Sequence, residues 1–253
     1  RFSLQEPELG RSTTNDLNHI PGAYYLDLNQ DLAGPVQTHG GRHPLPNPQP
    51  LAAKLSAMGI TSETLVIGYD DSRFAFAARL WWLLRYLGHP KVAVLNGGFS
   101  GYQAAGYPLT AETPPAKQGH FVARVQPQMV IDIHTVQSRA SEVALVDSRD
   151  RDRYLGLREP IDRVAGHIPG AVNYPWQSVT DEQGRLKSPA ELHQHWAELK
   201  ASEVWVYCGS GVTACVNLLA LEAAGIESGK LYAGSWSDWC SYPLNQTLEA
   251  QVV

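Results

Sequence analysis

The 253-residue sequence has room for one large domain or for two domains of roughly 120 residues, and either would be able to bury an apolar core. Hydrophobic residues make up 43% of the chain and charged residues 18%, and no apolar run approaches the ~20 residues that a membrane-spanning helix requires, which argues against an integral membrane protein. The formal net charge of −5 excludes a general attraction to nucleic acid, so an anionic substrate would have to be held by individual, locally placed cations.

Elements in the first half of the chain alternate between strand and helix. Apolar runs at residues 65–69 and 92–95 have the length of buried strands. Residues 74–87, between them, have the pattern of a helix. This alternation is typical of an α/β fold with parallel strands.

A polar stretch at residues 110–128 contains two adjacent prolines and begins without apolar periodicity, so it is the expected linker. It divides the chain into an expected N-terminal domain at residues 1–109 and an expected C-terminal domain at residues 129–253. Each of these lengths is sufficient for a small α/β domain.

The second half of the chain alternates in the same way. Short apolar runs at residues 144–147, 172–174 and 204–207 predict buried parallel strands. A helix is predicted to begin after Ser188, because a proline follows this serine and Glu191 stands three residues after it, which is the pattern of a capping box.

The two halves of the sequence resemble each other. The motif His-Ile-Pro-Gly-Ala occurs at residues 19–23 and again at residues 167–171, an offset of 148 residues (167 − 19). Two further landmarks repeat in the same order: residues 66–70 match 204–208, and residues 95–99 match 232–236. Three landmarks in one order indicate a duplication. We therefore expect two tandem α/β domains, each an open, mostly parallel sheet flanked by helices.

The duplication also predicts that the first copy lacks its first strand. Arg149 lies 18 residues before His167 (167 − 149), and Arg1 lies 18 residues before His19 (19 − 1), so Arg1 corresponds to Arg149. The strand that precedes Arg149 has no counterpart in the given sequence. We expect the natural chain to begin one strand and one helix earlier, by about 20–30 residues.

Three cysteines, Cys208, Cys215 and Cys240, lie near the C-terminal end of the chain. An odd number does not suit a disulfide framework and favours reduced thiols, so we expect a cytoplasmic protein. No two cysteines have C-x-x-C spacing and no histidine pair has metal-site spacing, so we expect no bound metal.

The segment Cys-Gly-Ser-Gly-Val-Thr-Ala at residues 208–214 follows a predicted strand and precedes an apolar helix. A strand, a glycine-bearing loop and a helix N-terminus form a cradle for an anion, because unpaired backbone N–H groups converge inside the loop. If the enclosed group is the sulfur of Cys208, these donors favour the thiolate and stabilise the charge on a persulfide. The glycines at positions 209 and 211 supply the backbone freedom that such a loop needs.

A free cysteine is more often a buried structural thiol, and this is the alternative for Cys208. Its expected place at a helix N-terminus favours a reactive group instead, because cysteines with stabilised thiolates occur there. Cys215 falls inside the following helix and Cys240 follows Trp239, so we expect both to be structural.

The sequence resembles the tandem-domain rhodanese-like sulfurtransferases over essentially its whole length. The resemblance is carried, in the family's order, by Asp-Ser-Arg at residues 147–149, Gly-His-Ile-Pro-Gly-Ala at 166–171, the loop at 208–214 and Gly-Ser-Trp at 234–236. It implies that Cys208 carries sulfur as a persulfide. Asp70 stands at the equivalent place in the first copy and cannot form a persulfide. The resemblance therefore implies a catalytically silent first domain that forms a wall of the active-site cleft.

Gly209 and Ser210 bear on the choice of sulfur donor. Family members that use thiosulfate have arginine and lysine immediately after the cysteine, whereas small neutral residues resemble the 3-mercaptopyruvate sulfurtransferases. A loop without cations also lacks the close ion pairs that would hold a sulfonate. We therefore expect 3-mercaptopyruvate as the donor, with thiosulfate as the alternative.

The carboxylate of such a donor needs a cationic partner. Arg153 matches the carboxylate-binding arginine of the family, and a guanidinium can pair with a carboxylate through two hydrogen bonds. The family's second arginine lies shortly before Gly-His-Ile-Pro, but the spacing here is shorter, which leaves Arg158 and Arg163 as alternatives. The loop is expected to complete the donor site with Gly209, Gly211, Val212 and Thr213.

His43, in the segment His-Pro-Leu-Pro, resembles the family histidine near the catalytic loop. The family partner of that histidine is an aspartate, whereas the matching residue here is Asn29, which argues against a Ser-His-Asp relay through Ser210. A positioned Ser210 hydroxyl would still polarise the donor, so Ser210 is a candidate catalytic residue beside Cys208. His19 and His167 occur in both copies and are expected to serve the fold.

The resemblance implies covalent catalysis without a cofactor, in which a small thiol, reduced thioredoxin or cyanide removes the sulfur from Cys208. Cysteine phosphatases of the same fold need an arginine at the sixth position after the cysteine, and that position is Ala214. Phosphatase activity is therefore not expected. A non-enzymatic sulfur-binding or regulatory module is the alternative of a different class, and neither nucleic acid nor a membrane is an expected partner.

Overall fold

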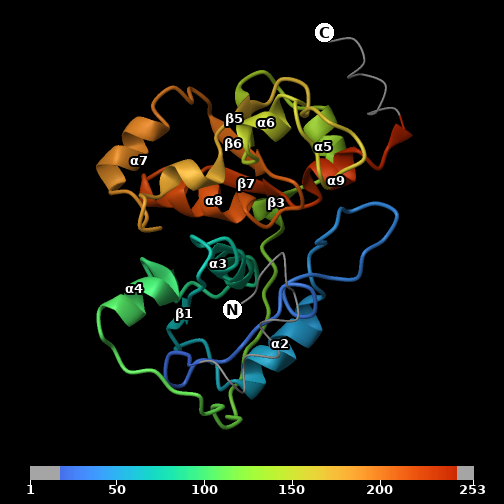
Figure 1. The fold of residues 1–253 in the computed structure, drawn as a ribbon. Helices are drawn as coiled ribbons and strands as arrows, with labels where there is room; N and C mark the ends of the chain where they lie inside the picture. The colour runs from blue at the N-terminus through green and yellow to red at the C-terminus, as the bar shows by residue number, and fades with distance from the viewer. Residues whose placement is uncertain (1–17, 244–253) are drawn as a thin grey trace. The chain divides into compact units, whose positions relative to one another are not determined.

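The computed structural model describes residues 18–243, which form two compact units (Figure 1). The first unit contains residues 18–34, 46–126 and 180–186, and the second contains residues 35–45, 127–179 and 187–243. Each unit therefore includes a short segment from the half of the sequence that mainly builds the other. The domain boundaries expected at residues 109 and 129 stay a prediction.

The first unit is built on a short parallel sheet. Its strands β1 (Val66–Gly68) and β2 (Val92–Val94) lie within the two predicted strand regions, and α3 (Ala77–Tyr86) packs on both. α2 (Pro48–Ala57) begins where the Asn47 side chain accepts a hydrogen bond from the amide of Gln49. α4 (Gly98–Ala104) follows β2. Residues of α2, of α3 and of the chain around them form one apolar cluster: Leu51, Ala52, Leu55, Ile60, Leu84, Leu87 and Phe121.

The helix predicted at residues 74–87 begins three residues later than expected, at Ala77. Arg73 and Phe74 have positive φ angles of 54° and 71°, which are incompatible with a right-handed helix. The chain turns there because the Asp70 carboxylate accepts hydrogen bonds from the amides of Phe74 and Phe76. A side-chain contact from outside the helix thus decides where the helix starts.

The second unit contains a five-stranded parallel sheet. In spatial order its strands are β3 (Val130–Ile131), β7 (Gly229–Tyr232), β6 (Glu203–Tyr207), β4 (Val143–Asp147) and β5 (Val172–Asn173). The three strands predicted for this half are confirmed as β4, β5 and β6. Because β6 lies between β7 and β4, the loop that follows it leaves the carboxyl edge of the sheet between two neighbouring strands, where α/β proteins commonly bind ligands.

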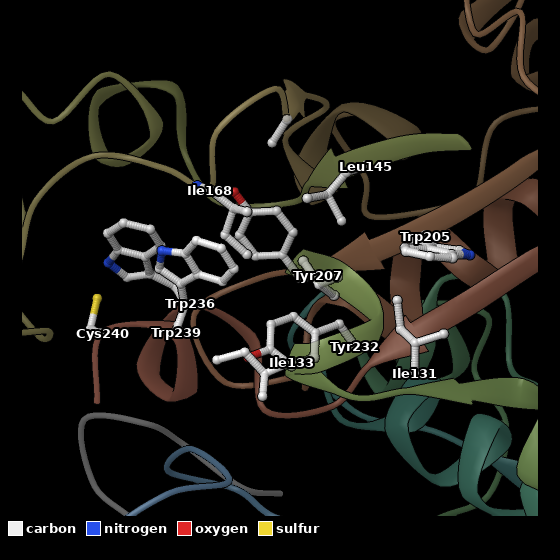
Figure 2. Packing of buried hydrophobic residues seen from close by; sticks show 12 residues of the cluster. Ile131, Ile133, Leu145, Ile168, Trp205, Tyr207, Tyr232, Trp236, Trp239 and Cys240 are labelled. Atoms are coloured by element: carbon white, nitrogen blue, oxygen red, sulfur yellow. Dashed lines mark hydrogen bonds between the residues drawn. The ribbon is translucent and has the colours of Figure 1, made fainter. Parts of the chain in front are cut away.

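Alternate residues of the central strands face opposite sides of the sheet, as the pleat requires. Leu145, Trp205 and Tyr207 belong to the apolar cluster that Figure 2 shows, together with residues of α5 (Ile133–Gln137) and α9 (Ser235–Trp239). The intervening residues of β6 are also buried, and α8 (Ala214–Ala223) packs on β6 and β7. Both faces of the sheet are therefore covered, as expected for parallel strands with apolar residues at every position.

The remaining helices of the second unit are short. α7 (Pro189–His195) packs on α8 and carries the predicted capping box, because the Ser188 side chain and the Glu191 carboxylate each accept a hydrogen bond from the other residue's amide. α6 (Arg151–Tyr154) follows β4. Single 3₁₀ turns are present at η1 (Pro127–Met129) and η2 (Trp176–Val179).

The two units repeat two hydrogen bonds at matching positions. The amide of Ile20 donates to the hydroxyl of Tyr69, and the amide of Ile168 donates to the hydroxyl of Tyr207. The carbonyl groups of residues 70 and 208 accept hydrogen bonds from the amides of residues 99 and 236, respectively. These bonds join the landmarks that the sequence repeats, so the duplication has a structural counterpart.

Both units have parallel strands flanked by helices, so the predicted α/β class is confirmed. Arg1, which the sequence pairs with Arg149, lies outside the described residues. Between residues 18 and 243, no helix combines the length and the apolar composition that crossing a bilayer would need.

Candidate active site

Cys208 is the first residue after β6, and the loop that it begins leads into α8. The residue is buried, with 2% of its surface exposed. The amide of Gly211 donates a hydrogen bond of 3.2 Å to Cys208 Sγ. An N–H group directed at the sulfur favours negative charge on it, and Gly211 supplies one of the converging N–H groups that the loop sequence predicts.

The first turn of α9 binds the backbone of this loop. The amide of Cys208 donates to Ser235 Oγ at 3.1 Å, and its carbonyl accepts from the amide of Trp236 at 3.0 Å. The carbonyl of Gly209 accepts from the amide of Ser237, also at 3.0 Å. Because neighbouring backbone atoms anchor both residues, the sulfur has a defined position relative to the sheet edge.

Gly211 is a position that requires glycine. Its φ angle is 77°, and a Cβ atom there would lie 2.3 Å from the carbonyl oxygen of Ala233. Val212, which is buried, and Thr213, which is half-buried, follow at the turn that begins α8. Their carbonyl groups accept the first hydrogen bonds of that turn, so their amides lie at the end of the loop nearest the helix N-terminus.

The corresponding loop of the first unit is filled by the carboxylate of Asp70. Its Oδ2 atom accepts hydrogen bonds of 2.8 Å from the amides of Phe76 and Ala77, and its Oδ1 atom accepts bonds from Ser72 at 2.8 Å and Phe74 at 3.1 Å. Four backbone amides therefore converge on one buried anion. This loop binds negative charge in the way predicted for the loop of Cys208, with a carboxylate in place of a sulfur.

Arg153, on α6, lies beside the loop of Cys208. The position that a Cβ atom on Gly209 would occupy is 3.4 Å from both terminal nitrogens of Arg153. The guanidinium donates to both carboxylate oxygens of Glu159, at 2.8 and 3.1 Å, and to Asp162 at 3.1 Å. The structure thus brings the arginine predicted to bind the donor next to the loop, with its orientation held by two carboxylates.

Arg42 is a residue of this site that the sequence does not indicate. Its Nη2 atom lies 3.0 Å from the Cβ position of Gly209, and its Nη1 atom forms an ion pair with Asp162. Burial lowers the pKa of Arg42, and the nearby charge of Cys208 partly opposes that effect. The loop itself contains no cation, but two guanidiniums from other segments approach it, so the expected lack of close ion pairs holds for the loop residues alone.

The imidazole of His43 meets Ser210: His43 Nδ1 lies 2.8 Å from Ser210 Oγ, and Ser210 is buried. These two residues, proposed from separate parts of the sequence, are therefore in contact. Asn29, which matches the position of the family's aspartate, belongs to the other unit, where its amide donates to Asp27. The hydrogen bond between His43 and Ser210 fixes the hydroxyl close to the start of the loop that begins at Cys208.

Arg149 is buried just after the end of β4, and its contacts are those of a structural residue. It donates to both carboxylate oxygens of Asp147 and to the carbonyl of Gly166, and it pairs with Glu159. Burial by itself would lower the pKa of Arg149, but the charge and hydrogen bonds of Asp147, together with the charges of Tyr207 and Glu159, outweigh this and raise it. Its cationic carbon lies 4.6 Å from the centre of the Trp236 ring. Arg149 thereby links the strand end to Glu159, which also binds Arg153.

Arg158 and Arg163, the alternatives for a second donor-binding arginine, are both exposed. The guanidinium that accompanies Arg153 at Gly209 is that of Arg42. Within residues 18–243, no group of three or more histidine, cysteine, aspartate or glutamate side chains is arranged to hold a metal ion.

The other singled-out residues lie in the protein core or in the repeated motif. Cys215 donates from Sγ to the carbonyl of Gly211 at 3.5 Å, and Cys240 belongs to the apolar cluster of Figure 2. His167 contacts the carbonyl of Tyr154 at 2.8 Å and stacks on its ring, and His19 contacts the adjacent carbonyl of Ile20. These contacts are local, as expected for residues that serve the fold.

Comparisons with known proteins agree with this architecture. The probable 3-mercaptopyruvate sulfurtransferase of Pseudomonas aeruginosa is 44% identical over 251 residues, which cover 96% of this chain and 88% of that protein. A putative thiosulfate sulfurtransferase of Mycobacterium tuberculosis is 35% identical over 250 residues, which cover 96% and 87%.

A solved structure is similar over nearly the same range. The crystal structure of the 3-mercaptopyruvate sulfotransferase SseA from Escherichia coli is 32% identical, with a TM-score of 0.75, and the match covers 93% of this chain and 87% of that one. The model of the rhodanese-like domain matches twice, at residues 11–105 and at residues 133–242. The chain therefore belongs to the rhodanese-like family and contains two copies of its domain.

Proposed function

We propose that this chain is a sulfurtransferase that moves sulfane sulfur from 3-mercaptopyruvate to a thiol or cyanide acceptor through a persulfide on Cys208. The observation that carries the proposal is the position of the Cys208 sulfur: it accepts a hydrogen bond from Gly211 in a loop that two guanidiniums approach. The similarity to named 3-mercaptopyruvate sulfurtransferases over most of the chain supports the same reaction.

In the first half-reaction, the Cys208 thiolate attacks the sulfur of the donor. A sulfur–sulfur bond forms and the carbon–sulfur bond breaks, so that its electron pair becomes the enolate of pyruvate. The enolate then takes up a proton, and the sulfur remains on Cys208 as a persulfide. The Gly211 amide favours negative charge on the loop sulfur during this exchange, which is a stabilisation that acts where charge develops.

The Ser210 hydroxyl is proposed to polarise the donor ketone while the bond to sulfur breaks. Ser210 lies two residues after Cys208, and His43 holds its oxygen at 2.8 Å. A hydroxyl that donates a hydrogen bond to the ketone oxygen would stabilise the enolate, and His43 would orient that hydroxyl by donating its Nδ1–H to the serine oxygen. This role needs no aspartate partner for His43.

In the second half-reaction, a nucleophile attacks the outer sulfur of the persulfide and the Cys208 thiolate leaves. With cyanide the product is thiocyanate, and with a thiol the product is a new persulfide. A covalent intermediate between two half-reactions predicts ping-pong kinetics. Reduced thioredoxin or a small thiol is the proposed acceptor, in keeping with the proposed cytoplasmic location.

Arg153 is proposed to bind the carboxylate of the donor, because its guanidinium lies beside Gly209 and is oriented by Glu159 and Asp162. These two carboxylates offset much of its charge. A singly charged carboxylate therefore suits the site better than the dianion of thiosulfate, which favours 3-mercaptopyruvate. The relative named as a putative thiosulfate sulfurtransferase keeps thiosulfate as the second candidate donor.

Steady-state kinetics with 3-mercaptopyruvate and thiosulfate in parallel test the proposal. We expect kcat/KM to favour 3-mercaptopyruvate by at least about tenfold, which corresponds to ~1.4 kcal/mol in transition-state stabilisation. Cys208→Ser should abolish turnover with both donors, and intact-protein mass spectrometry should detect an added sulfur atom on the wild type alone. Equal or reversed donor preference would overturn the donor assignment, and absence of a persulfide would favour a non-enzymatic binding module.

A further inference from the structure

Arg42 belongs to the segment at residues 35–45, which is part of the second unit although it comes from the first half of the sequence. The amide of Gly40 donates to Asp238 Oδ1 at 2.7 Å. The amide of Arg42 donates to Ser237 Oγ at 3.1 Å. Backbone groups on both sides of Gly41 are therefore bound to α9, the helix whose first turn also holds the loop of Cys208.

The contact between this segment and α9 is close. Gly41 has a φ angle of 80°, and a Cβ atom there would lie 2.3 Å from the carbonyl oxygen of Gly234. On the other side of Arg42, the ring of His43 contacts Ser210. The backbone of Arg42 is thus fixed from both directions, so its side chain extends toward the loop from a defined starting point.

The guanidiniums of Arg42 and Arg153 both lie over Gly209. From the Cβ position of this glycine, Arg42 Nη2 is 3.0 Å away and the two terminal nitrogens of Arg153 are 3.4 Å away. Two cations therefore occupy the space that a side chain at position 209 would fill. Arg42, Arg153 and Cys208 are all far apart in the sequence.

The two guanidiniums differ in the number of hydrogen bonds that they form with acidic side chains. Arg153 donates to both oxygens of Glu159 and to Asp162, and its side chain is 11% exposed. Among the described residues, Arg42 pairs with Asp162 through Nη1, whereas its Nη2 atom is the one nearest Gly209, and its side chain is 32% exposed. Arg42 is therefore the more accessible cation at the loop.

We propose that Arg42 is a donor-binding residue whose guanidinium receives the carboxylate of a 2-oxo acid donor at the loop of Cys208, while Arg153, held by Glu159 and Asp162, supports it from the other side. The proposal rests on the proposed function, and it assigns the second cation of the site to residue 42 instead of to Arg158 or Arg163. A carboxylate between the two guanidiniums would accept hydrogen bonds from both.

A pair of donors that differ only in the carboxylate tests this role. 3-Mercaptopyruvate carries the carboxylate, and mercaptoacetone has the same mercaptoketone group without it. Loss of a charged hydrogen-bonding partner predicts that Arg42→Gln lowers kcat/KM for 3-mercaptopyruvate by about 10- to 100-fold, mainly through KM. The same variant should keep kcat/KM for mercaptoacetone within about twofold of the wild type, because that donor has no group for Arg42 to bind.

Two further variants serve as matched controls. Arg42→Lys keeps the charge but removes the planar fork, so its loss with 3-mercaptopyruvate should be smaller than that of Arg42→Gln. Arg151→Gln removes the same charge from an exposed position on α6 and should leave both donors unaffected. Equal losses for both donors in Arg42→Gln would show that Arg42 supports only the structure of the loop, and would overturn the proposal.

Alkylation of Cys208 tests the same role without any turnover. Iodoacetate carries a carboxylate and iodoacetamide does not, and both react with a thiolate by displacement of iodide. We expect Arg42→Gln to lower the ratio of the two alkylation rates, iodoacetate over iodoacetamide, by about tenfold at the peptide that contains Cys208. Cys240 lies on a different tryptic peptide, whereas Cys215 shares the peptide of Cys208 because residues 201–229 contain no lysine or arginine, so fragment-ion mass spectrometry assigns the alkylated residue.

The two experiments distinguish the failure of the inference from the failure of the proposed function. A wild-type protein that turns over 3-mercaptopyruvate, with both the donor comparison and the alkylation ratio unchanged in Arg42→Gln, would overturn the role of Arg42 alone. A wild-type protein without turnover of 3-mercaptopyruvate, but with an alkylation ratio that depends on Arg42, would overturn the proposed donor and support Arg42 as a carboxylate-binding residue.

Discussion

Asp70 Oδ2 accepts a hydrogen bond of 2.8 Å from the amide of Ala77, the first residue of α3. The same carboxylate accepts bonds from three further amides, including that of Phe74, whose φ angle is positive. In the first copy of the domain, a side-chain carboxylate therefore takes the place of the anion that the loop of the second copy is proposed to bind. The loop of the first copy is therefore occupied by a carboxylate of the chain itself.

The first prediction concerns Asp70. Asp70→Ala should lower the free energy of unfolding of the first unit by about 2–4 kcal/mol, because it leaves buried amides without an acceptor. Urea denaturation monitored by circular dichroism measures this. Asp71→Ala, at the neighbouring exposed position, serves as the control and should cost much less. If the two variants were equally stable, the amides around Asp70 would contribute nothing specific.

The two glycines of the loop that begins at Cys208 should respond differently to substitution by alanine. Gly209→Ala places a methyl group 3.0 Å from the Arg42 guanidinium and 3.4 Å from the Arg153 guanidinium. Both contacts are with the far ends of long side chains, which can move. We expect it to lower kcat/KM for 3-mercaptopyruvate by about tenfold through displacement of the guanidiniums, with a small effect on stability.

Gly211→Ala combines a positive φ angle with a contact of 2.3 Å to the backbone of Ala233. This backbone cannot yield in the way that an arginine side chain can. We expect a loss of at least about 2 kcal/mol in the free energy of unfolding. Thermal denaturation of both glycine variants checks the contrast, and a Gly209→Ala variant as unstable as Gly211→Ala would contradict it.

The contact between His43 and Ser210 predicts strong energetic coupling. His43→Ala and Ser210→Ala should each lower kcat for 3-mercaptopyruvate by about 10- to 100-fold, because each removes part of the group proposed to polarise the donor. The double variant should be little worse than the more damaging single variant, since the two residues act as one unit. Multiplicative losses would mean that the two side chains act independently.

Two buried tyrosines should make the folded protein less stable at high pH. Burial raises the pKa of Tyr207, and its hydrogen bond to Asp147 adds to the effect; burial, followed by the charge of Asp238, raises the pKa of Tyr232. An unfolded tyrosine ionises near pH ~10, so above that pH the folded state binds more protons than the unfolded state. Stability is therefore complete below pH ~10 and falls as the pH rises further, by up to ~1.4 kcal/mol per pH unit for each tyrosine.

Urea unfolding between about pH 8 and pH 11.5 measures this dependence. Tyr232→Phe should make the decline less steep, because it removes one group that must stay protonated in the folded protein. Tyr107→Phe is the matched control, since Tyr107 is 59% exposed and should leave the slope unchanged. A slope that is the same in all three proteins would assign the alkaline loss to other groups.

Much of the fold follows from local pattern. The strand regions, the capping box at Ser188 and the duplication are visible in the sequence because they depend on apolar runs, caps and repeats along the chain. The predicted start of the helix after Asp70 is too early because that start does not depend on a local pattern. Its start depends on a carboxylate that accepts hydrogen bonds from amides four to seven residues further along the chain. The periodicity of apolar residues does not reveal that contact.

The candidate site divides in the same way. The sequence indicates Cys208 and the glycines of its loop, since a strand, a loop and a helix N-terminus in succession already define an anion cradle. Arg153 was indicated by the resemblance to the rhodanese-like family. Arg42 was not found, and Arg158 and Arg163 were considered in its place. Arg42 reaches Gly209 only because the segment at residues 35–45 folds into the second unit.

The sequence by itself determined the α/β class, the two copies of the domain and the cysteine that directly follows a central strand, because each depends on residues that are neighbours along the chain. The tertiary structure alone decided which cations approach that cysteine and how far acidic side chains neutralise them. Electrostatic interactions depend on distance in space, and the pairs Arg42–Asp162 and Arg153–Glu159 become close to Gly209 only when separate segments pack together.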